Sequence, residues 1–197
     1  MGLRKNRSAM ESAGNRPSRR SVRLPGFDYS KVGMYFLTIC AAERRSIFGE
    51  IRGNDATLGP IGRVVQTCWI EIPKHFPTVK IETYVVMPNH IHGILTIQSE
   101  WPDANRQEKT APAVESFGRP TPKSIPTIVR SFKSAASKRV RESGLAGGES
   151  IWQRGYYEHV LRNTREYVEA TNYILQNPAR WANDEDNLNR QSGAENL

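Results

Sequence analysis

Two histidines separated by one residue are the part of the sequence with the clearest chemical potential. His90 and His92 lie in VVMPNHIHGIL (residues 85–95), after a Met-Pro-Asn turn and inside an otherwise apolar run. Because side chains alternate across a strand, both imidazoles are expected on one face and Ile91 on the other. Such a pair can bind Zn, Mn, Co, Ni or Fe and leaves positions open for oxygen ligands. His-x-His alone is a weak signal, since two polar residues on a half-exposed strand would look the same.

A second set of polar residues lies about 80 residues downstream, in the segment TREYVEATNYILQNP. Tyr173 and Asn177 are four residues apart, so their side chains can be neighbours on one face of a helix. On a helical wheel Tyr173 falls outside the apolar side of this helix, which is also typical of a boundary aromatic. Asn177 precedes Pro178, which disfavours helical geometry at that position, so Asn177 can also simply end the helix.

Taken together, these four side chains suit phosphodiester chemistry. A tyrosine hydroxyl is a poor nucleophile at neutral pH because its pKa is about 10. A divalent metal held by His90, His92 and the amide oxygen of Asn177 would polarise a phosphodiester and offset the charge of the transition state. Tyr173 would then attack phosphorus and form a covalent phosphotyrosine that stores the bond for rejoining.

Periodicity and turn signals indicate which elements must position these residues. Strands are expected over residues 34–42, 78–88, 90–98 and 151–162, with a shorter strand and a turn in 46–59. Helices are expected over 60–76, 121–143 and 164–178. A tight Pro-Asn turn joins the strands of 78–98, which predicts an antiparallel hairpin. The order predicts an α+β fold with a ferredoxin-like layout, in which helices pack on a central antiparallel sheet.

The chain is expected to form one domain flanked by less ordered segments. Residues 1–24 are interpreted as a disordered basic arm, 25–181 as a single domain with a mobile loop at about 99–120, and 182–197 as a polar tail.

No apolar run approaches the ~20 residues needed to span a bilayer. Cys40 and Cys68 each lie in an apolar segment, which is typical of buried, reduced thiols in a cytoplasmic protein.

The charge of the chain favours a nucleic-acid partner. The formal net charge is +8, and basic residues cluster in segments 1–23 and 121–143, each of which contains one acidic residue. Clustered lysine and arginine neutralise phosphates and release counterions. A basic surface that is merely solvated is the alternative interpretation.

Three segments carry a resemblance to a known family: residues 19–51, 85–95 and 151–181. The pattern MPNHxHG, followed by WQxxYYEHxxRN and YIxxNPxRW, resembles that of the REP-associated tyrosine transposases. These belong to the HUH endonuclease superfamily, with the single-strand "peel-and-paste" insertion-sequence transposases. The resemblance implies that Tyr173 is the nucleophile and that His90, His92 and Asn177 bind Mg²⁺ or Mn²⁺. Insertion-sequence relatives usually carry Gln at the position of Asn177.

The resemblance also implies the substrate and the setting. The substrate would be single-stranded DNA with imperfect-palindrome hairpins, cleaved to a 5′-phosphotyrosine and a free 3′-OH. The protein would be a prokaryotic, cytoplasmic and nucleoid-associated monomer or homodimer. The residues considered for DNA contacts are Arg119, Lys123, Arg130, Lys133 and Arg154 on phosphates, Trp152 or Tyr157 on an unpaired base, and Arg19, Arg20 and Arg23 on a short single-stranded tag beside the hairpin.

Two other functions remain open at this stage. The first is a non-catalytic regulator that binds single-stranded DNA or RNA hairpins and derives from a transposase. The second is a metallohydrolase that uses the His-x-His pair. The metallohydrolase is disfavoured because the remaining histidines are His75 and His159 and no acidic ligand cluster stands out. Tyr156, Tyr157 and Tyr167 are rival tyrosines for the nucleophile, although a core or DNA-stacking role is favoured for Tyr156 and Tyr157.

Overall fold

The computed structural model describes residues 27–99, 121–184 and 187. The expected arm at 1–24, the loop at 99–120 apart from Ser99, and most of the tail at 182–197 lie outside these residues. The elements are β1 (Gly33–Cys40), β2 (Gly49–Arg52), β3 (Asp55–Leu58), α1 (Pro60–Ile70), α2 (Ile72–His75), β4 (Val79–Val86), β5 (His90–Ile97), α3 (Ile125–Glu142), β6 (Tyr157–Leu161) and α4 (Thr164–Arg180), with 3₁₀ turns at Ala42–Arg44 and Trp181–Asn183.

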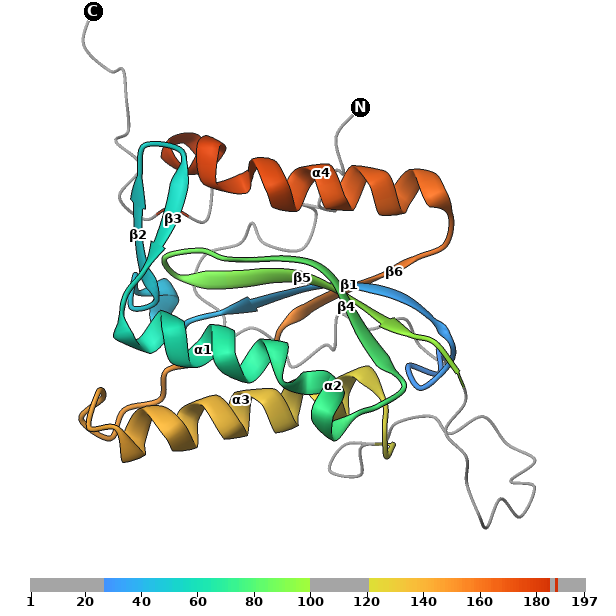
Figure 1. Ribbon diagram of the computed structural model, residues 1–197, viewed down its shortest axis with the longest axis horizontal. Coiled ribbons are helices and arrows are strands. Elements are labelled where there is room, and N and C mark those ends of the chain that lie inside the picture. The colour runs from blue at the N-terminus through green and yellow to red at the C-terminus, as the bar shows by residue number, and fades with distance from the viewer. Residues whose placement is uncertain (1–26, 100–120, 185–186, 188–197) are drawn as a thin grey trace, which may run out of the picture.

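The central sheet has four strands in the order β4-β5-β1-β6, and every neighbouring pair is antiparallel. Helices α1 and α3 cover one face of the sheet, and α4 crosses the other (Figure 1). Taken in chain order, β1-α1-β4-β5-α3-β6 is the ferredoxin-like arrangement. The predicted α+β fold is therefore confirmed. None of the described helices combines the length and the hydropathy required to cross a membrane.

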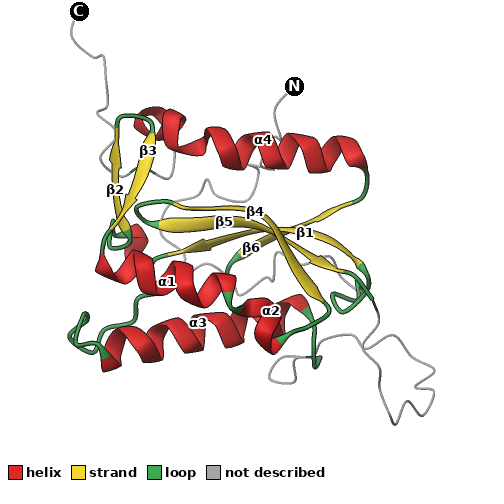
Figure 2. Ribbon diagram, in the orientation of Figure 1, coloured by secondary structure: helices red, strands yellow, loops and turns green. Residues whose placement is uncertain are grey.

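Three expected elements differ in detail from the structure. Residues 46–59 form a hairpin, β2 paired with β3, rather than a strand followed by a turn (Figure 2). The hairpin turns at Gly53, whose φ of 62° is in the left-handed region that favours glycine. The helix expected over 60–76 is divided into α1 and α2, with Pro73 in the first turn of α2. The strand expected over 151–162 contracts to β6.

The alternation of β5 divides its side chains between two different environments. Ile91, Leu95 and their odd-numbered neighbours belong to the large core under α1 and α3. Ile94 belongs to a smaller cluster under α4, together with Phe36 and Ile174. His90 and His92 share the parity of Ile94, so they lie on the α4 face of the sheet.

Gly93 allows the core helix α1 to approach the strand that carries the histidines. A Cβ atom at this position would lie 2.4 Å from Cζ2 of Trp69, and Trp69 is fully buried. Real Cβ atoms do not approach ring carbons this closely, so any side chain here would force the indole or the strand to move.

We expect Gly93→Ala to lower the free energy of unfolding by about 1–3 kcal/mol, because it overpacks the core against Trp69. Chemical denaturation would measure this change. Gly147→Ala is the matched control, since an added Cβ there meets no atom within 4 Å. The control should change stability by no more than about 0.5 kcal/mol. Equal effects of the two substitutions would contradict this account of Gly93.

Candidate active site

The two histidines lie together at the start of β5, where β1 ends. His90 is 0% exposed and His92 is 1% exposed, and their ring centroids are 4.3 Å apart. The neighbouring strand places Cys40 opposite His90 and Thr38 opposite His92. The rings are therefore adjacent on one face of the sheet, as the alternation of the sequence predicts.

Asn89 fixes the ring of His90. The Nδ1 of His90 lies 2.7 Å from Oδ1 of Asn89, and Nδ2 of Asn89 donates to the carbonyl of Arg44 at 3.0 Å. With its amide oriented in this way, Asn89 can only accept from the imidazole, so Nδ1 carries the hydrogen and Nε2 keeps a lone pair. The hydrogen bond from Nδ2 of Asn89 to the carbonyl of Arg44 also holds the turn at Glu43 and Arg44. The φ values of these two residues, 53° and 54°, are costly for residues other than glycine.

His92 is oriented from the neighbouring strand. Its Nδ1 shares a hydrogen bond of 2.8 Å with Oγ1 of Thr38. The ring of Phe36 stacks on the imidazole, with 5.5 Å between centroids and 24° between planes. The Nε2 atoms of both histidines are buried. Binding through Nδ1 to a neighbour leaves Nε2 as the ring nitrogen that can serve a ligand, which is the usual arrangement around metal-binding histidines.

Helix α4 brings Tyr173 to this pair. The tyrosine ring lies 5.1 Å from the ring of His92 and 6.0 Å from that of Phe36, measured between centroids. The expectation that Tyr173 falls outside the apolar side of the helix was wrong. The buried residues of α4 are Ala170, Ile174 and Asn177, and Tyr173 packs beside them. The buried face of α4 extends beyond the apolar side of the helical wheel, because the sheet beneath the helix is itself partly polar.

Asn177 lies within helix α4 rather than at its end. The helix continues through Pro178 to Arg180, and Asn177 is 1% exposed. It is bracketed along the helix by two residues that contact the histidines, Tyr173 and Trp181, whose ring lies 5.9 Å from that of His90. Asn177 is therefore positioned opposite the histidine pair.

The start of α4 is fixed by a pair of capping side chains. Asn163 accepts a hydrogen bond from the backbone N–H of Glu166 at 2.9 Å. The carboxylate of Glu166 in turn accepts from the backbone N–H of Arg162 at 3.0 Å. This backbone hydrogen bond, with a smaller contribution from His159, holds the pKa of Glu166 below its usual value. Reciprocal capping anchors the helix that carries Tyr173.

The amide of Asn177 has one satisfied end and one unsatisfied end. Its Nδ2 donates to Oδ2 of Asp184 at 3.2 Å, whereas its Oδ1 is buried with no hydrogen-bond partner among the described residues. A buried carbonyl oxygen of this kind is a suitable ligand for a hard divalent cation. Two imidazole nitrogens and one amide oxygen fit Mn²⁺ well and Mg²⁺ less well, because Mg²⁺ prefers oxygen. Within the described ranges, no three His, Cys, Asp or Glu side chains gather into a possible metal site.

Two of the residues considered for DNA contacts have structural roles instead. Trp152 is 7% exposed and packs in the core between Phe48 and Phe132, so the prediction that it stacks on a base was wrong. The ammonium of Lys133 donates to the carbonyls of Gln153 and Gly155 at 2.7 and 3.0 Å. Burial lowers the pKa of Lys133. Its ammonium therefore links the turn at residues 153–155 to α3.

The other residues considered for DNA contacts differ in exposure. Tyr157 is 39% exposed, and its ring lies 6.4 Å from that of Phe36, at the edge of the histidine site. Arg130 and Arg154 are exposed, and Lys123 is half-buried. The remaining candidates, Arg19, Arg20, Arg23 and Arg119, lie outside the described residues.

The rival tyrosines do not take the place of Tyr173. Tyr156 packs against the large core on the opposite face of the sheet, and Tyr167 packs in the smaller cluster under α4. Four further residues contact the site without having been predicted from the sequence: Thr38, Asn89, Trp181 and Asp184. Asn89 could have been found, because it precedes His90 within the motif. Asp184 gave no such signal.

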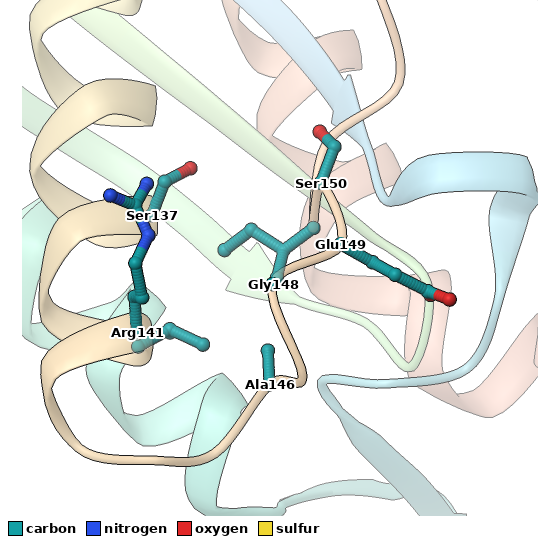
Figure 3. Close-up of a pocket in the computed structure, with 8 residues that line it drawn as sticks. Ser137, Arg141, Ala146, Gly148, Glu149 and Ser150 are labelled. Atoms are coloured by element: carbon teal, nitrogen blue, oxygen red, sulfur yellow. The ribbon is translucent and has the colours of Figure 1, made fainter.

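A surface pocket of about 270 Å³ lies apart from this site. It opens between the C-terminal half of α3, at Ser137 and Arg141, and the segment Ala146–Ile151 (Figure 3). Helix α3 covers the face of the sheet opposite to α4 (Figure 1). None of the histidine-site residues lines this pocket.

Comparisons with known proteins found sequence relatives and structural neighbours, including the following three. An uncharacterized protein of Haemophilus influenzae is 35% identical over 85% of this chain and 92% of its own length. A protein of the same organism, named "Putative REP-associated tyrosine transposase", is 31% identical over 78% of this chain and 74% of its own length. A REP-associated tyrosine transposase solved bound to a REP hairpin has the same fold, with a TM-score of 0.51 and 22% identity over 83% of this chain and 73% of that one. No family model matches.

We expect Asn89→Ala to lower the free energy of unfolding by about 1–3 kcal/mol, because it leaves the buried Nδ1–H of His90 and the carbonyl of Arg44 without this partner. It should also remove the bias toward the Nδ1–H tautomer of His90. Urea denaturation and ¹⁵N NMR of the imidazole would measure the two effects. Asn172→Ala, on the exposed side of α4, is the control. An unchanged His90 tautomer in Asn89→Ala would contradict this role.

Proposed function

Because the chain belongs to the REP-associated tyrosine transposases, we propose that it is a metal-dependent endonuclease and strand transferase. Its proposed substrate is single-stranded DNA with REP-like hairpins. The observation that supports this activity most directly is the contact between Tyr173 and His92, with the buried Oδ1 of Asn177 one helical turn away. Two elements, β5 and α4, thus bring the proposed nucleophile next to one of the proposed metal ligands.

The proposed reaction is a transesterification at phosphorus. The phenolic oxygen of Tyr173 loses its proton to solvent and attacks the phosphodiester, forming a Tyr–O–P bond. The bond from phosphorus to the 3′-oxygen breaks, and that oxygen takes a proton from solvent and leaves as a free 3′-OH. The downstream strand stays attached to the protein through a 5′-phosphotyrosine. A 3′-OH can later attack this linkage, which rejoins DNA and releases the tyrosine.

The residues that would hold a divalent cation are His90, His92 and Asn177. Bound there, Mg²⁺ or Mn²⁺ supplies Lewis-acid polarisation of the phosphodiester. The protein itself supplies the orientation. Asn89 and Thr38 hold the imidazoles through Nδ1, and the rigid backbone of α4 fixes the spacing between Tyr173 and Asn177.

The proposed DNA path begins at the edge of this site. The structural neighbour was solved with a REP hairpin, and we extend that class of ligand to this chain. The half-exposed ring of Tyr157 lies next to Phe36, which stacks on His92. An aromatic ring in this position is suited to stack on an unpaired base near the cleaved phosphate. The exposed guanidinium of Arg154, three residues earlier, is suited to a neighbouring phosphate.

The covalent intermediate provides the central test. We expect purified protein, incubated with a REP-like hairpin bearing single-stranded flanks, to yield an adduct on a denaturing gel. A label at the 3′ end of the DNA should travel with the protein, whereas a label at the 5′ end should be released on a shorter strand. Tyr173→Phe should bind the same DNA but form no adduct, because it lacks the nucleophilic oxygen.

Tyr167→Phe is the matched control on the same helix, and it should leave the adduct intact. Adduct formation by Tyr173→Phe at the wild-type level would overturn the assignment of the nucleophile. Tight hairpin binding without an adduct from the wild-type protein would instead favour a non-catalytic regulator.

Removal of divalent cations tests the metal requirement. We expect EDTA to abolish the adduct and excess Mn²⁺ to restore it, because the uncompensated charge of the transition state is unfavourable. His90→Ala should abolish the adduct with or without Mn²⁺. His75→Ala, on the exposed surface of α2, should behave as the wild type. Cleavage that persists undiminished in EDTA would contradict the metal role while leaving the tyrosine assignment standing.

A further inference from the structure

Asp184 lies beyond the last helix, in a stretch that the sequence indicates only as polar tail. The chain leaves α4 through the 3₁₀ turn Trp181–Asn183 and folds back, so that the backbone N–H of Asp184 donates to the carbonyl of Trp181 at 3.1 Å. The side chain of Asn187 also donates to that carbonyl at 3.0 Å. This compact turn places the carboxylate of Asp184 3.2 Å from Nδ2 of Asn177.

The chemistry of an amide makes this contact informative. The side chain of asparagine presents a donor on one side and an acceptor on the other, and a rotation of 180° exchanges them. A carboxylate accepts hydrogen bonds and, when ionised, donates none. Asp184 therefore selects the orientation in which Nδ2 of Asn177 faces the tail and Oδ1 faces away from it.

The opposite orientation would be harmful to a metal site. Asn177 is bracketed by Tyr173 and Trp181, whose rings contact the two histidines. The hydrogen on Nδ1 of His90 leaves its Nε2 as an acceptor. A rotated Asn177 would direct its N–H groups, rather than its oxygen, toward this acceptor side of the site. An N–H group cannot bind a cation and would compete for the imidazole lone pair.

We propose that Asp184 is a positioning residue that holds the amide of Asn177 with its oxygen directed at the histidine pair. This inference rests on the proposed metal role of Asn177. It assigns Asp184, in the turn after α4, a part in building the site, acting through Asn177 rather than on the reacting atoms. Groups that orient metal ligands from behind commonly change metal affinity by about 10–100-fold when they are removed.

Direct binding of Mn²⁺ to the full chain without DNA tests the proposal, for example by electron paramagnetic resonance of free Mn²⁺. We expect Asp184→Ala to weaken binding by about 10–100-fold. Asp184→Asn, which keeps an oxygen acceptor but loses the charge, should stay within about threefold of the wild type. Asn183→Ala, exposed in the same turn, should have no effect.

The side-chain NH₂ of Asn177, observed by ¹⁵N NMR in metal-free protein, provides a second measurement. We expect both of its resonances to shift in Asp184→Ala and to return toward wild-type positions in Asp184→Asn. A purely structural role would instead lower the melting temperature of Asp184→Ala without a selective change in this group.

Three results would overturn the proposal. The first is unchanged Mn²⁺ affinity in Asp184→Ala. The second is equal weakening in the Ala and Asn variants, which would show that charge rather than orientation matters. The third is a wild-type protein that binds no Mn²⁺, which would overturn the metal role of the site as well. The first result, combined with loss of Mn²⁺ binding in His90→Ala, would overturn this inference and leave the metal role of the site standing.

Discussion

Two imidazoles buried between a β-sheet and a helix are the constraint on which the rest of this structure depends. A buried polar group without a hydrogen bond costs about 1–3 kcal/mol, so each ring requires partners that the fold must deliver. Asn89 and Thr38 satisfy the Nδ1 atoms from the turn before β5 and from the adjacent strand. By occupying Nδ1, these neighbours also leave Nε2 as the ring nitrogen that can serve a ligand. The same hydrogen bonds therefore stabilise the buried rings and fix the orientation of the imidazoles.

The two faces of the sheet differ in composition: one carries the large apolar core, and the other carries the two histidines. On one face, Ile91 and Leu95 pack into a continuous apolar core, and Gly93 admits the ring of Trp69 at close range. On the other face, the same strand presents His90 and His92 to a smaller cluster under α4. Because successive residues of one strand serve both faces, tight packing on the core side limits the movement of the histidines on the other.

The sequence predicted the features that arise from local periodicity, and it failed where the tertiary environment decides. The hairpin of β4 and β5 and the shared face of the histidines follow from neighbours in the chain. The wheel of α4 misplaced Tyr173 because apolar residues mark the buried side only when the opposing surface is apolar. Trp152 lies in the core rather than at a position that could stack on a base, and no local pattern distinguishes a core indole in an extended segment. Asp184 is brought to Asn177 by a turn that composition alone does not predict.

The position of Asn177 on helix α4 bears on its proposed role as a metal ligand, for which the resemblance to insertion-sequence transposases implies Gln as the more usual residue. Asn has one methylene fewer, so its amide stays closer to the helix backbone and loses less conformational freedom when it is held in place. The shorter side chain must therefore start closer to the site. Asn177 is a buried residue within α4, because the helix runs past Pro178 instead of ending before it. That extra turn also carries the chain to Trp181, which contacts His90, and to Asp184, which accepts from the amide. Continuation of the helix through a proline thus places both the proposed ligand and the group that orients it.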